Sequence, residues 1–551
     1  MGKKIIILIC TICLQASTYL QAQISHGGRP LPLAMTRSTQ EEMFVDLPAF
    51  DISEQLRLDS LEESDLRSGY RFAYKFMTDY TPENSGIRFT TQDGTSVWRL
   101  GIRSANALSL NLMFTEYELP EGASLYLYNT DQTQIIGSFN HLNNSRRSIL
   151  PVSPIEGDEL IIEYQEPANA GFHGKLTVGE VNHGYRNFKQ SSPQPDQDDF
   201  NCIPALACYQ DTTNGYNDIG RSVVLLIING ITGCTGTLVN NTANDKKPYI
   251  LTASHCLNNQ FTIKNPDYEE IAGTVVCFFN YNSPNCSPVE MGPTDQSVAS
   301  AHYRAVNEKT DMALLELQDM PPADYQPYYA GWNASDAGFP PYAGIHHPSG
   351  SPKRLNLSLE NCELSTYPYY QILGFDRNAH WKVKRWASGC TAGGSSGSPL
   401  FDKDNLVVGG LTGGFSDCAN PINDYYYALK YSWAPSEEKN KQLKYWLDPL
   451  NLDRLVCNGL DPRSSETDLE QIYFREGTSI AVDKEQKTLF INLRGPIRQA
   501  GLSIISMEGK TLRKWKIENE QTTIPLGSIP PGVYIVQVTS DNKLYTQKII
   551  F

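Results

Sequence analysis

Basic residues are in the minority in this chain of 551 residues, which has 46 Lys and Arg against 61 Asp and Glu and a formal charge of −15. Nucleic acids and anionic lipid surfaces bind proteins through clusters of Lys and Arg, so neither is expected as the main partner. Only 19% of the residues are charged and 40% are hydrophobic, which excludes a disordered chain. The length exceeds what one hydrophobic core supports and predicts two to four domains.

Long apolar runs are also scarce. The run at residues 5–14 is the longest near the N-terminus, and it is too short to span a bilayer stably. Two lysines precede it, and the small residue Ala22 follows it. A basic segment, an apolar core and a small residue in this order predict a signal peptide over residues 1–22. We therefore expect a secreted protein without a stable membrane span.

Cysteine is absent from the flanks of the mature chain. Of the 12 cysteines, Cys10 and Cys13 leave with the signal peptide, and the others all lie within residues 202–457. An even number of cysteines in an exported protein predicts disulfides. A zinc site would need closely spaced Cys or His pairs, so we expect no metal and no cofactor. The adjacent His346 and His347 have diverging side chains and are interpreted as structural residues of a loop.

Short alternating runs separated by turn residues predict β-structure in most of the chain. One short helix is expected at residues 53–66 of the polar leader, and the amphipathic segment 436–447 is expected to be a closing helix. Polar linkers at residues 189–200 and 461–470 separate the parts. The expected division is a signal peptide (1–22), an N-terminal segment with a β-sandwich (23–195), a cysteine-rich domain (196–462) and a small C-terminal β-sandwich (463–551).

Histidine is absent after residue 380, and this absence decides between classes of serine hydrolase. The stretch 393–397 matches the GxSxG pattern of α/β-hydrolases, but those enzymes need a His after the Ser, so the match is accidental. The order that remains is His255, Asp311 and Ser396, which is the order of chymotrypsin-like proteases. Acyl transfer needs such a hydroxyl, an imidazole that takes its proton and a buried carboxylate that fixes the imidazole tautomer.

The residues around these three candidates resemble trypsin-like proteases and, more narrowly, bacterial lysyl endopeptidases. The resemblance covers about residues 200–460 and rests on four stretches: Cys234-Thr-Gly-Thr-Leu-Val, Thr252-Ala-Ser-His255-Cys256, His346-His-Pro and Gly394-Ser-Ser-Gly-Ser-Pro399. It implies an all-β, chymotrypsin-like double β-barrel over residues 196–462. It also implies that His255 is the general base, Asp311 its orienting acid and Ser396 the nucleophile. The N–H groups of Gly394 and Ser396 would form the oxyanion hole.

The same resemblance implies the specificity of the enzyme. Cys390 stands where trypsin has its specificity Asp, whereas lysyl endopeptidases carry theirs downstream, where this chain has Asp424. A desolvated carboxylate there would select a Lys side chain. Thr412 replaces a His that supports specificity in the family, so cleavage after both Lys and Arg stays open. The alternative for Asp424 is a turn residue before a strand. Ser395 replaces the Asp that pairs with a new N-terminus in trypsin-like zymogens, so activation by that ion pair is not expected.

Disulfides follow from the alignment with lysyl endopeptidases, and two more pairs are left by elimination. The pairs from the alignment are Cys202–Cys418, Cys208–Cys286 and Cys234–Cys256; those from elimination are Cys362–Cys390 and Cys277–Cys457.

Both flanks resemble known accessory segments. Pro531-Gly-Val-Tyr-Ile-Val-Gln-Val and the ending Lys548-Ile-Ile-Phe resemble the sorting domain of type IX secretion cargo, which implies that secretion machinery as a partner. Residues 23–195 resemble a protease propeptide, which would assist folding and block the cleft. Lys189 is the expected self-cleavage point.

The function predicted is that of a secreted serine endopeptidase that cleaves protein or peptide substrates after Lys, or after Lys and Arg. The protein would be extracellular, free or attached to the cell surface. One alternative is a glutamyl endopeptidase, whose family shares the serine motif but would need a cationic pocket with a His after the nucleophile. The other is a non-catalytic binding protein on a protease fold.

Overall fold

The chain folds into two compact units, Met1–Gly459 and Leu460–Phe551. The computed structural model describes residues 21–22, 24–33, 37–63, 70–186, 202–209, 214–258, 264–286, 291–463, 478–483, 487–493, 500–506, 510–527, 529–540 and 543–550. Nearly all of the expected signal peptide, Lys189 and the linker at 189–200 lie outside these residues. No helix within the described ranges is long and apolar enough to cross a membrane.

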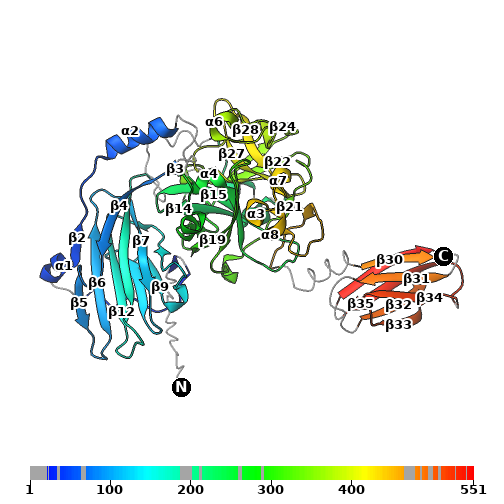
Figure 1. The fold of residues 1–551 in the computed structure, drawn as a ribbon, viewed down its shortest axis with the longest axis horizontal. Helices are drawn as coiled ribbons and strands as arrows, with labels where there is room; N and C mark the ends of the chain where they lie inside the picture. The colour runs from blue at the N-terminus through cyan, green and yellow to red at the C-terminus, as the bar shows by residue number, and fades with distance from the viewer. Residues whose placement is uncertain are drawn as a thin grey trace, which may run out of the picture. The chain divides into compact units, whose positions relative to one another are not determined.

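The first unit begins with a β-sandwich (Figure 1). One sheet has the order β1-β9-β8-β12-β6-β2, with β5 on β6, and the other has the order β10-β7-β13-β4, with β11 on β7. The strands are β1 (Gln21–Ala22), β2 (Phe44–Asp46), β4 (Ala73–Tyr80), β5 (Ile87–Thr90), β6 (Ser96–Arg103), β7 (Ser109–Glu118), β8 (Ser124–Tyr128), β9 (Ile135–Phe139), β10 (Leu150–Pro151), β11 (Ile155–Glu156), β12 (Glu159–Glu166) and β13 (Lys175–Gly184). The helices are α1 (Arg37–Met43), α2 (Ile52–Glu63) and the 3-10 turn η1 (His141–Asn143).

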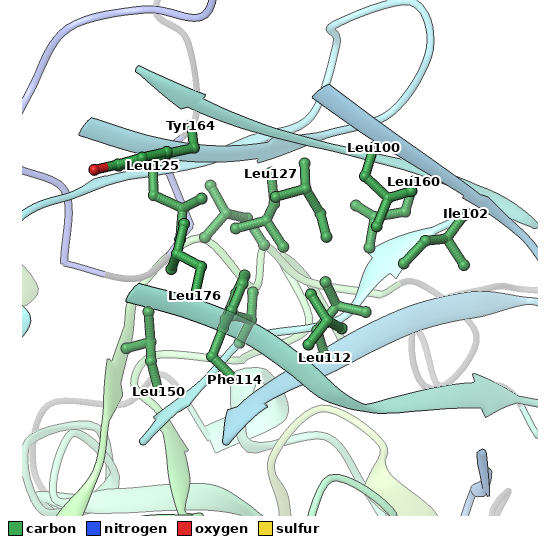
Figure 2. Close-up of a cluster of buried hydrophobic side chains, with 14 of the residues drawn as sticks. Leu100, Ile102, Leu112, Phe114, Leu125, Leu127, Leu150, Leu160, Tyr164 and Leu176 are labelled. Carbon is green, nitrogen blue, oxygen red and sulfur yellow. The ribbon is translucent and has the colours of Figure 1, made fainter. Parts of the chain in front are cut away.

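Large aliphatic and aromatic side chains fill the space between these two sheets (Figure 2). Leu100 and Leu160 point inward from one sheet, and Leu112 and Phe114 from the other. All four are buried. Because side chains alternate between the two faces of a strand, the period-two runs in the sequence put one apolar face inward on each sheet. The expected N-terminal β-sandwich is confirmed.

Two further sheets form the double β-barrel. The first has the order β18-β17-β14-β15-β16-β20-β19, with β3 added on β15. Its strands are β3 (Tyr70–Arg71), β14 (Val223–Ile228), β15 (Thr232–Val239), β16 (Tyr249–Ala253), β17 (Val276–Phe278), β18 (Ser297–Ala299), β19 (Ala301–Asn307) and β20 (Met312–Leu317). The short helices around it are η3 (Leu206–Tyr209), α3 (Tyr216–Gly220), α4 (Ser254–Leu257) and α5 (Tyr268–Gly273).

The second barrel sheet has the order β23-β22-β26-β27-β28-β25-β24, with β21 on β27 and β29 on β21. Its strands are β21 (Trp332–Asn333), β22 (Tyr342–His346), β23 (Arg354–Ser358), β24 (Glu363–Ser365), β25 (His380–Arg385), β26 (Pro399–Phe401), β27 (Val407–Gly414), β28 (Ile422–Ala428) and β29 (Val456–Cys457). The helices are η5 (Ala323–Tyr325), η6 (Pro348–Gly350), α6 (Tyr370–Leu373), α7 (Leu429–Ser432), η7 (Lys439–Lys441) and α8 (Lys444–Leu447). Together the two sheets confirm the expected fold class.

The helix expected over residues 436–447 is wrong. The structure has only η7 and α8 there, each less than two turns long. The N–H groups of Leu443 and Lys444 donate to the carbonyls of Ser432 and Trp433, at 3.0 and 2.8 Å. A continuous helix would need those N–H groups for bonds within the helix, so the tertiary contact replaces it.

The second unit is a small sandwich with its own core. Its sheets have the orders β30-β31-β34 and β33-β32-β35-β36. Buried residues from both sheets, such as Leu489, Leu502 and Val536, form one cluster. The strands are β30 (Thr478–Asp483), β31 (Thr488–Leu493), β32 (Ala500–Ser506), β33 (Thr511–Ile517), β34 (Gln521–Pro525), β35 (Val533–Ser540) and β36 (Lys543–Ile550).

The structure contains three of the five expected disulfides: Cys202–Cys418, Cys208–Cys286 and Cys234–Cys256.

The two pairs assigned by elimination, Cys362–Cys390 and Cys277–Cys457, are wrong. Cys277 is buried in β17 of the first barrel sheet, whereas Cys457 lies in β29 at the margin of the second. Cys390 has its Sγ 3.6 Å from the Sγ of Cys202. Elimination failed because it pairs the remaining cysteines by number alone, whereas a disulfide needs two cysteines that the strands bring close together.

Candidate active site

Two neighbouring strands of the first barrel sheet position His255 and Asp311. β16 ends at Ala253, two residues before His255, and β20 begins at Met312, directly after Asp311. These strands pair antiparallel with Ala253 opposite Met312. Since opposite residues of such a pair lie within about 5.5 Å of each other, the register brings the imidazole and the carboxylate together.

The carboxylate of Asp311 holds the imidazole of His255 through several hydrogen bonds. His255 Nδ1 lies 2.9 Å from Asp311 Oδ2 and 3.1 Å from Oδ1. The backbone N–H of His255 and the hydroxyl of Ser254 both donate to Oδ1 at 3.0 Å. Asp311 is fully buried and the His255 side chain is 11% exposed. A buried carboxylate on Nδ1 leaves Nε2 as the nitrogen available to a reacting group.

Ser396 lies in the loop before β26, and backbone contacts attach it to the first barrel sheet. The N–H of Thr235 in β15 donates to the Ser396 carbonyl at 2.9 Å. Cys256 Sγ, in the residue after His255, lies 3.7 Å from the same carbonyl. The disulfide from Cys234 to Cys256 fixes β15 to the histidine segment. Ser396 therefore lies at the seam where the residues around His255 meet the second barrel.

The loop before Ser396 presents two backbone N–H groups. Within the described ranges, neither the N–H of Gly394 nor that of Ser396 has a hydrogen-bond acceptor. The carbonyl of Gly393 accepts from the N–H of Ser349 at 2.6 Å. In a trans peptide the N–H points opposite to the carbonyl, so this bond turns the N–H of Gly394 away from Ser349. Gly394 has a φ of +88°, and a Cβ there would lie 2.8 Å from the His347 carbonyl, so a glycine is required.

Asp424 is buried in β28 rather than in a turn. Its Oδ2 accepts from Trp386 Nε1 at 2.6 Å, from Ser416 Oγ at 2.6 Å and from Thr391 Oγ1 at 3.0 Å. No described Lys or Arg forms an ion pair with it. Burial raises the pKa of Asp424, while hydrogen bonds from Ser416, Trp386 and Thr391 lower it. Thr391 lies five residues before Ser396, so this carboxylate borders the loop of the nucleophile.

Sequence reasoning missed several contacts of this site. Ser254, Trp386 and Ser416 were not singled out, and no motif marks them as donors to Asp311 or Asp424. His346 was interpreted as structural, and the structure pairs it with Ser395, whose Oγ lies 2.7 Å from His346 Nδ1. Residues from separate strands meet here, and a single sequence carries no signal for such a meeting.

A cluster of three cysteine sulfurs does not form a metal site. The Sγ atoms of Cys202, Cys390 and Cys418 lie within 4.8 Å of one another. Two of them, Cys202 and Cys418, share a disulfide and cannot act as thiolate ligands.

Comparison with known proteins gives matches for two segments. Residues 197–427 match the family model "Lysyl endopeptidase, C-terminal domain", and residues 485–551 match "Secretion system C-terminal sorting domain". Lysyl endopeptidase of Pseudomonas aeruginosa is 29% identical over 373 residues, which cover 61% of this chain and 73% of that relative.

Solved protease structures are also among the proteins that the chain is similar to, at low identity. The active form of the Rv3671c protease of M. tuberculosis is 15% identical and covers 38% of this chain and 78% of its own, with a TM-score of 0.26. A Glu endopeptidase is 17% identical over 38% of this chain and 85% of its own, also with a TM-score of 0.26. The matching segments show that this chain is a secreted serine endopeptidase, with a protease domain that resembles lysyl endopeptidases and a C-terminal sorting domain of a secretion system.

Proposed function

We propose that the enzyme cleaves peptide bonds after Lys, with Ser396 as nucleophile, His255 as general base and Asp311 as the group that orients His255. The observation that carries this proposal is the buried Asp311 carboxylate 2.9 Å from His255 Nδ1. The carboxylate accepts a hydrogen bond from Nδ1, which orients the ring and leaves Nε2 open to the nucleophile, as a base needs.

The reaction then proceeds in two acyl-transfer steps. Ser396 Oγ attacks the scissile carbonyl as His255 Nε2 takes its proton, and the carbonyl oxygen becomes negatively charged. The N–H groups of Gly394 and Ser396 stabilise that oxygen, and removal of one such donor typically lowers the rate about 10²–10³-fold. The protonated His255 gives its proton to the leaving amine, and water then attacks the acyl-enzyme by the same route.

Asp424 is the residue proposed to select Lys. Its carboxylate is buried, borders the loop of Ser396 and has no described cationic partner, so a Lys ammonium would supply the missing charge. Any uncharged P1 side chain would leave that carboxylate unpaired, which costs binding free energy. The same carboxylate argues against the glutamyl endopeptidase alternative, because a Glu P1 side chain would place two negative charges together.

The test uses the mature enzyme on a protein mixture, with the P1 residues tabulated by mass spectrometry. Cleavage after Lys supports the proposal, and cleavage after Glu or large apolar residues contradicts the role of Asp424. A Ser396→Ala variant should lose measurable turnover, whereas Ser335→Ala, an exposed serine, should keep the parent rate. Equal cleavage by S396A and parent would end the catalytic assignment and favour a binding protein.

We also propose that residues 23–195 are a propeptide that blocks the cleft. Two successive strands belong to different sheets: β3 pairs with β15 of the first barrel sheet, and β4 belongs to the sandwich. Tyr70 lies opposite Gly233, two residues before Thr235, and its Cβ approaches Gly393. A substrate that pairs with this edge of β15 as an added strand would need the place that β3 occupies. Release of the propeptide is therefore required for cleavage of proteins.

A further inference from the structure

The loop after β22 contacts the oxyanion loop, residues 392–396, at several points. Ser349 donates its N–H to the Gly393 carbonyl at 2.6 Å. The His347 N–H donates to Thr235 Oγ1 at 3.1 Å, and that hydroxyl donates to the Gly394 carbonyl at 2.9 Å. The last residue of β22 also takes part, since His346 Nδ1 lies 2.7 Å from Ser395 Oγ.

The hydrogen bonds of His346 fix its tautomer. Ser395 Oγ accepts from the Ala392 N–H at 3.1 Å, so its own proton is available to His346 Nδ1. On the other side, the amide nitrogen of Asn356 donates to the Cys390 carbonyl at 2.8 Å, and its Oδ1 lies 3.1 Å from His346 Nε2. Because Oδ1 can only accept, Nε2 carries the proton and Nδ1 accepts. The imidazole is therefore neutral.

This arrangement holds the chain at two points. One is Cys390, two residues before the oxyanion loop, which Asn356 holds. The other is Ser395, which His346 holds and which lies directly between the two N–H donors of the proposed oxyanion hole. Both His346 and Ser395 are buried, at 1% and 0% exposed. Trypsin-like zymogens order the equivalent loop with an ion pair between an Asp and a new N-terminus, and Ser395 cannot form that pair.

We propose that neutral His346 is a positioning residue, which holds the oxyanion loop through Ser395 in place of an N-terminal ion pair. The proposal rests on the proposed function. The loop then has its active geometry before any maturation cleavage, and maturation only has to clear the cleft. Burial, which lowers the pKa of His346 to about 4, keeps the ring neutral at neutral pH.

Two isosteric variants separate the two bonds of the ring. In His346→Asn, the amide oxygen can take the place of Nδ1 and keep the bond from Ser395. In His346→Gln, the amide nitrogen can take the place of Nε2 and keep the bond to Asn356 while the bond to Ser395 is lost. Ser395→Ala removes the same bond with a smaller change. His302→Asn, at a partly exposed histidine paired with Glu269, is the matched control.

The measurements are kcat and KM on a peptide amide with Lys at P1 and inhibition by a peptide aldehyde ending in Lys, whose adduct carries an oxyanion. H346Q and S395A should lower kcat about 10–10²-fold with KM within threefold, and aldehyde binding should weaken by a similar factor. H346N should stay within about fivefold of the parent, and H302N should equal it. Thermal unfolding identifies variants that fail to fold, and S395A then decides the test.

The proposal would be overturned if folded H346Q and S395A kept the parental kcat. It would also be overturned if KM rose by the same factor by which kcat fell. An enzyme with an additional residue at its mature N-terminus should keep the parental kcat, and a large loss would show that the N-terminus is needed after all. If the parent itself fails to cleave and equals S396A, the proposed function fails instead.

Discussion

At the scale of single residues, Asp424 is a buried carboxylate without a cationic partner among the described residues. Three side chains donate hydrogen bonds to it, but none of them is a cation. Asp311, which is equally buried, differs because an imidazole that can become cationic lies beside it. The two carboxylates therefore suit different tasks. Asp311 stabilises the positive charge that forms on His255 during the reaction, and Asp424 suits a positively charged side chain of the substrate.

Replacement of Asp424 by Asn should remove cleavage after Lys. Loss of one partner of a buried charged pair costs about 2–5 kcal/mol, so kcat/KM for a Lys substrate should fall about 30-fold or more. Asp404→Asn, at a carboxylate paired with Lys403 next in the chain, is the control and should keep the parental kcat/KM. Unchanged Lys cleavage by D424N would contradict the assignment of Asp424.

The D424N variant should also change how the free energy of unfolding depends on pH. Burial raises the pKa of Asp424, so the folded protein binds this proton more tightly than the unfolded chain does. The stabilising contribution of that proton is complete below the unfolded pKa and is lost as the pH rises through the folded one. The free energy of unfolding of D424N should therefore increase relative to the parent between pH 4 and pH 7, measured by urea titration. A constant difference across this range would show that the carboxylate is not destabilised by burial.

At the scale of elements, β3 connects the sandwich to the protease. Phe72, just after β3, has its N–H bonded to the Ile231 carbonyl at 3.0 Å. Its buried side chain joins a cluster with Leu225 and Phe278 of the first barrel sheet. The pairing of β3 with β15 thus has both a backbone and an apolar component.

Phe72→Ala should weaken the block of the cleft. Truncation of a buried Phe costs about 3–5 kcal/mol, so the uncleaved chain should gain turnover of a peptide substrate by about 10-fold or more. The measurement uses full-length enzyme with Lys189→Gln, shown to be intact by mass spectrometry. Met77→Ala, an exposed residue of β4 at 73% exposure, is the control and should leave the latent activity unchanged. Full activity of the intact K189Q chain without further changes would exclude the block.

At the scale of the whole molecule, the C-terminal sandwich has a core of its own, and the described residues of that core all lie within the second unit. Deletion of residues 460–551 should therefore leave kcat/KM within about twofold of the parent after maturation and leave the thermal unfolding of the protease unchanged. The same deletion should abolish export through the secretion system, measured by the enzyme found outside the cell. Loss of activity in the purified truncated enzyme would show that the units depend on each other.

The sequence was sufficient for the parts of the molecule that local patterns specify. Period-two strands and the cysteines in family-like stretches predicted features that the structure contains, and His255 and Asp311 do lie in contact. The role of Ser396 as their partner stays a prediction. What could not be predicted depends on long-range contacts. Hydrogen bonds from the N–H groups of Leu443 and Lys444 to the carbonyls of Ser432 and Trp433 replace the helix expected at 436–447. Proximity in the fold decides which cysteines pair.

The position of β3 has a consequence for when the enzyme becomes active. While the chain is intact, the tether keeps β3 beside β15 at an effective concentration that short tethers bring to about the millimolar range. A cut in the connecting segment would make the propeptide a separate molecule. Its occupancy of the site beside β15 would then depend on its concentration relative to its dissociation constant for the protease. Dilution outside the cell would then lower the propeptide concentration, so the propeptide would dissociate and the protease would become active without any further signal.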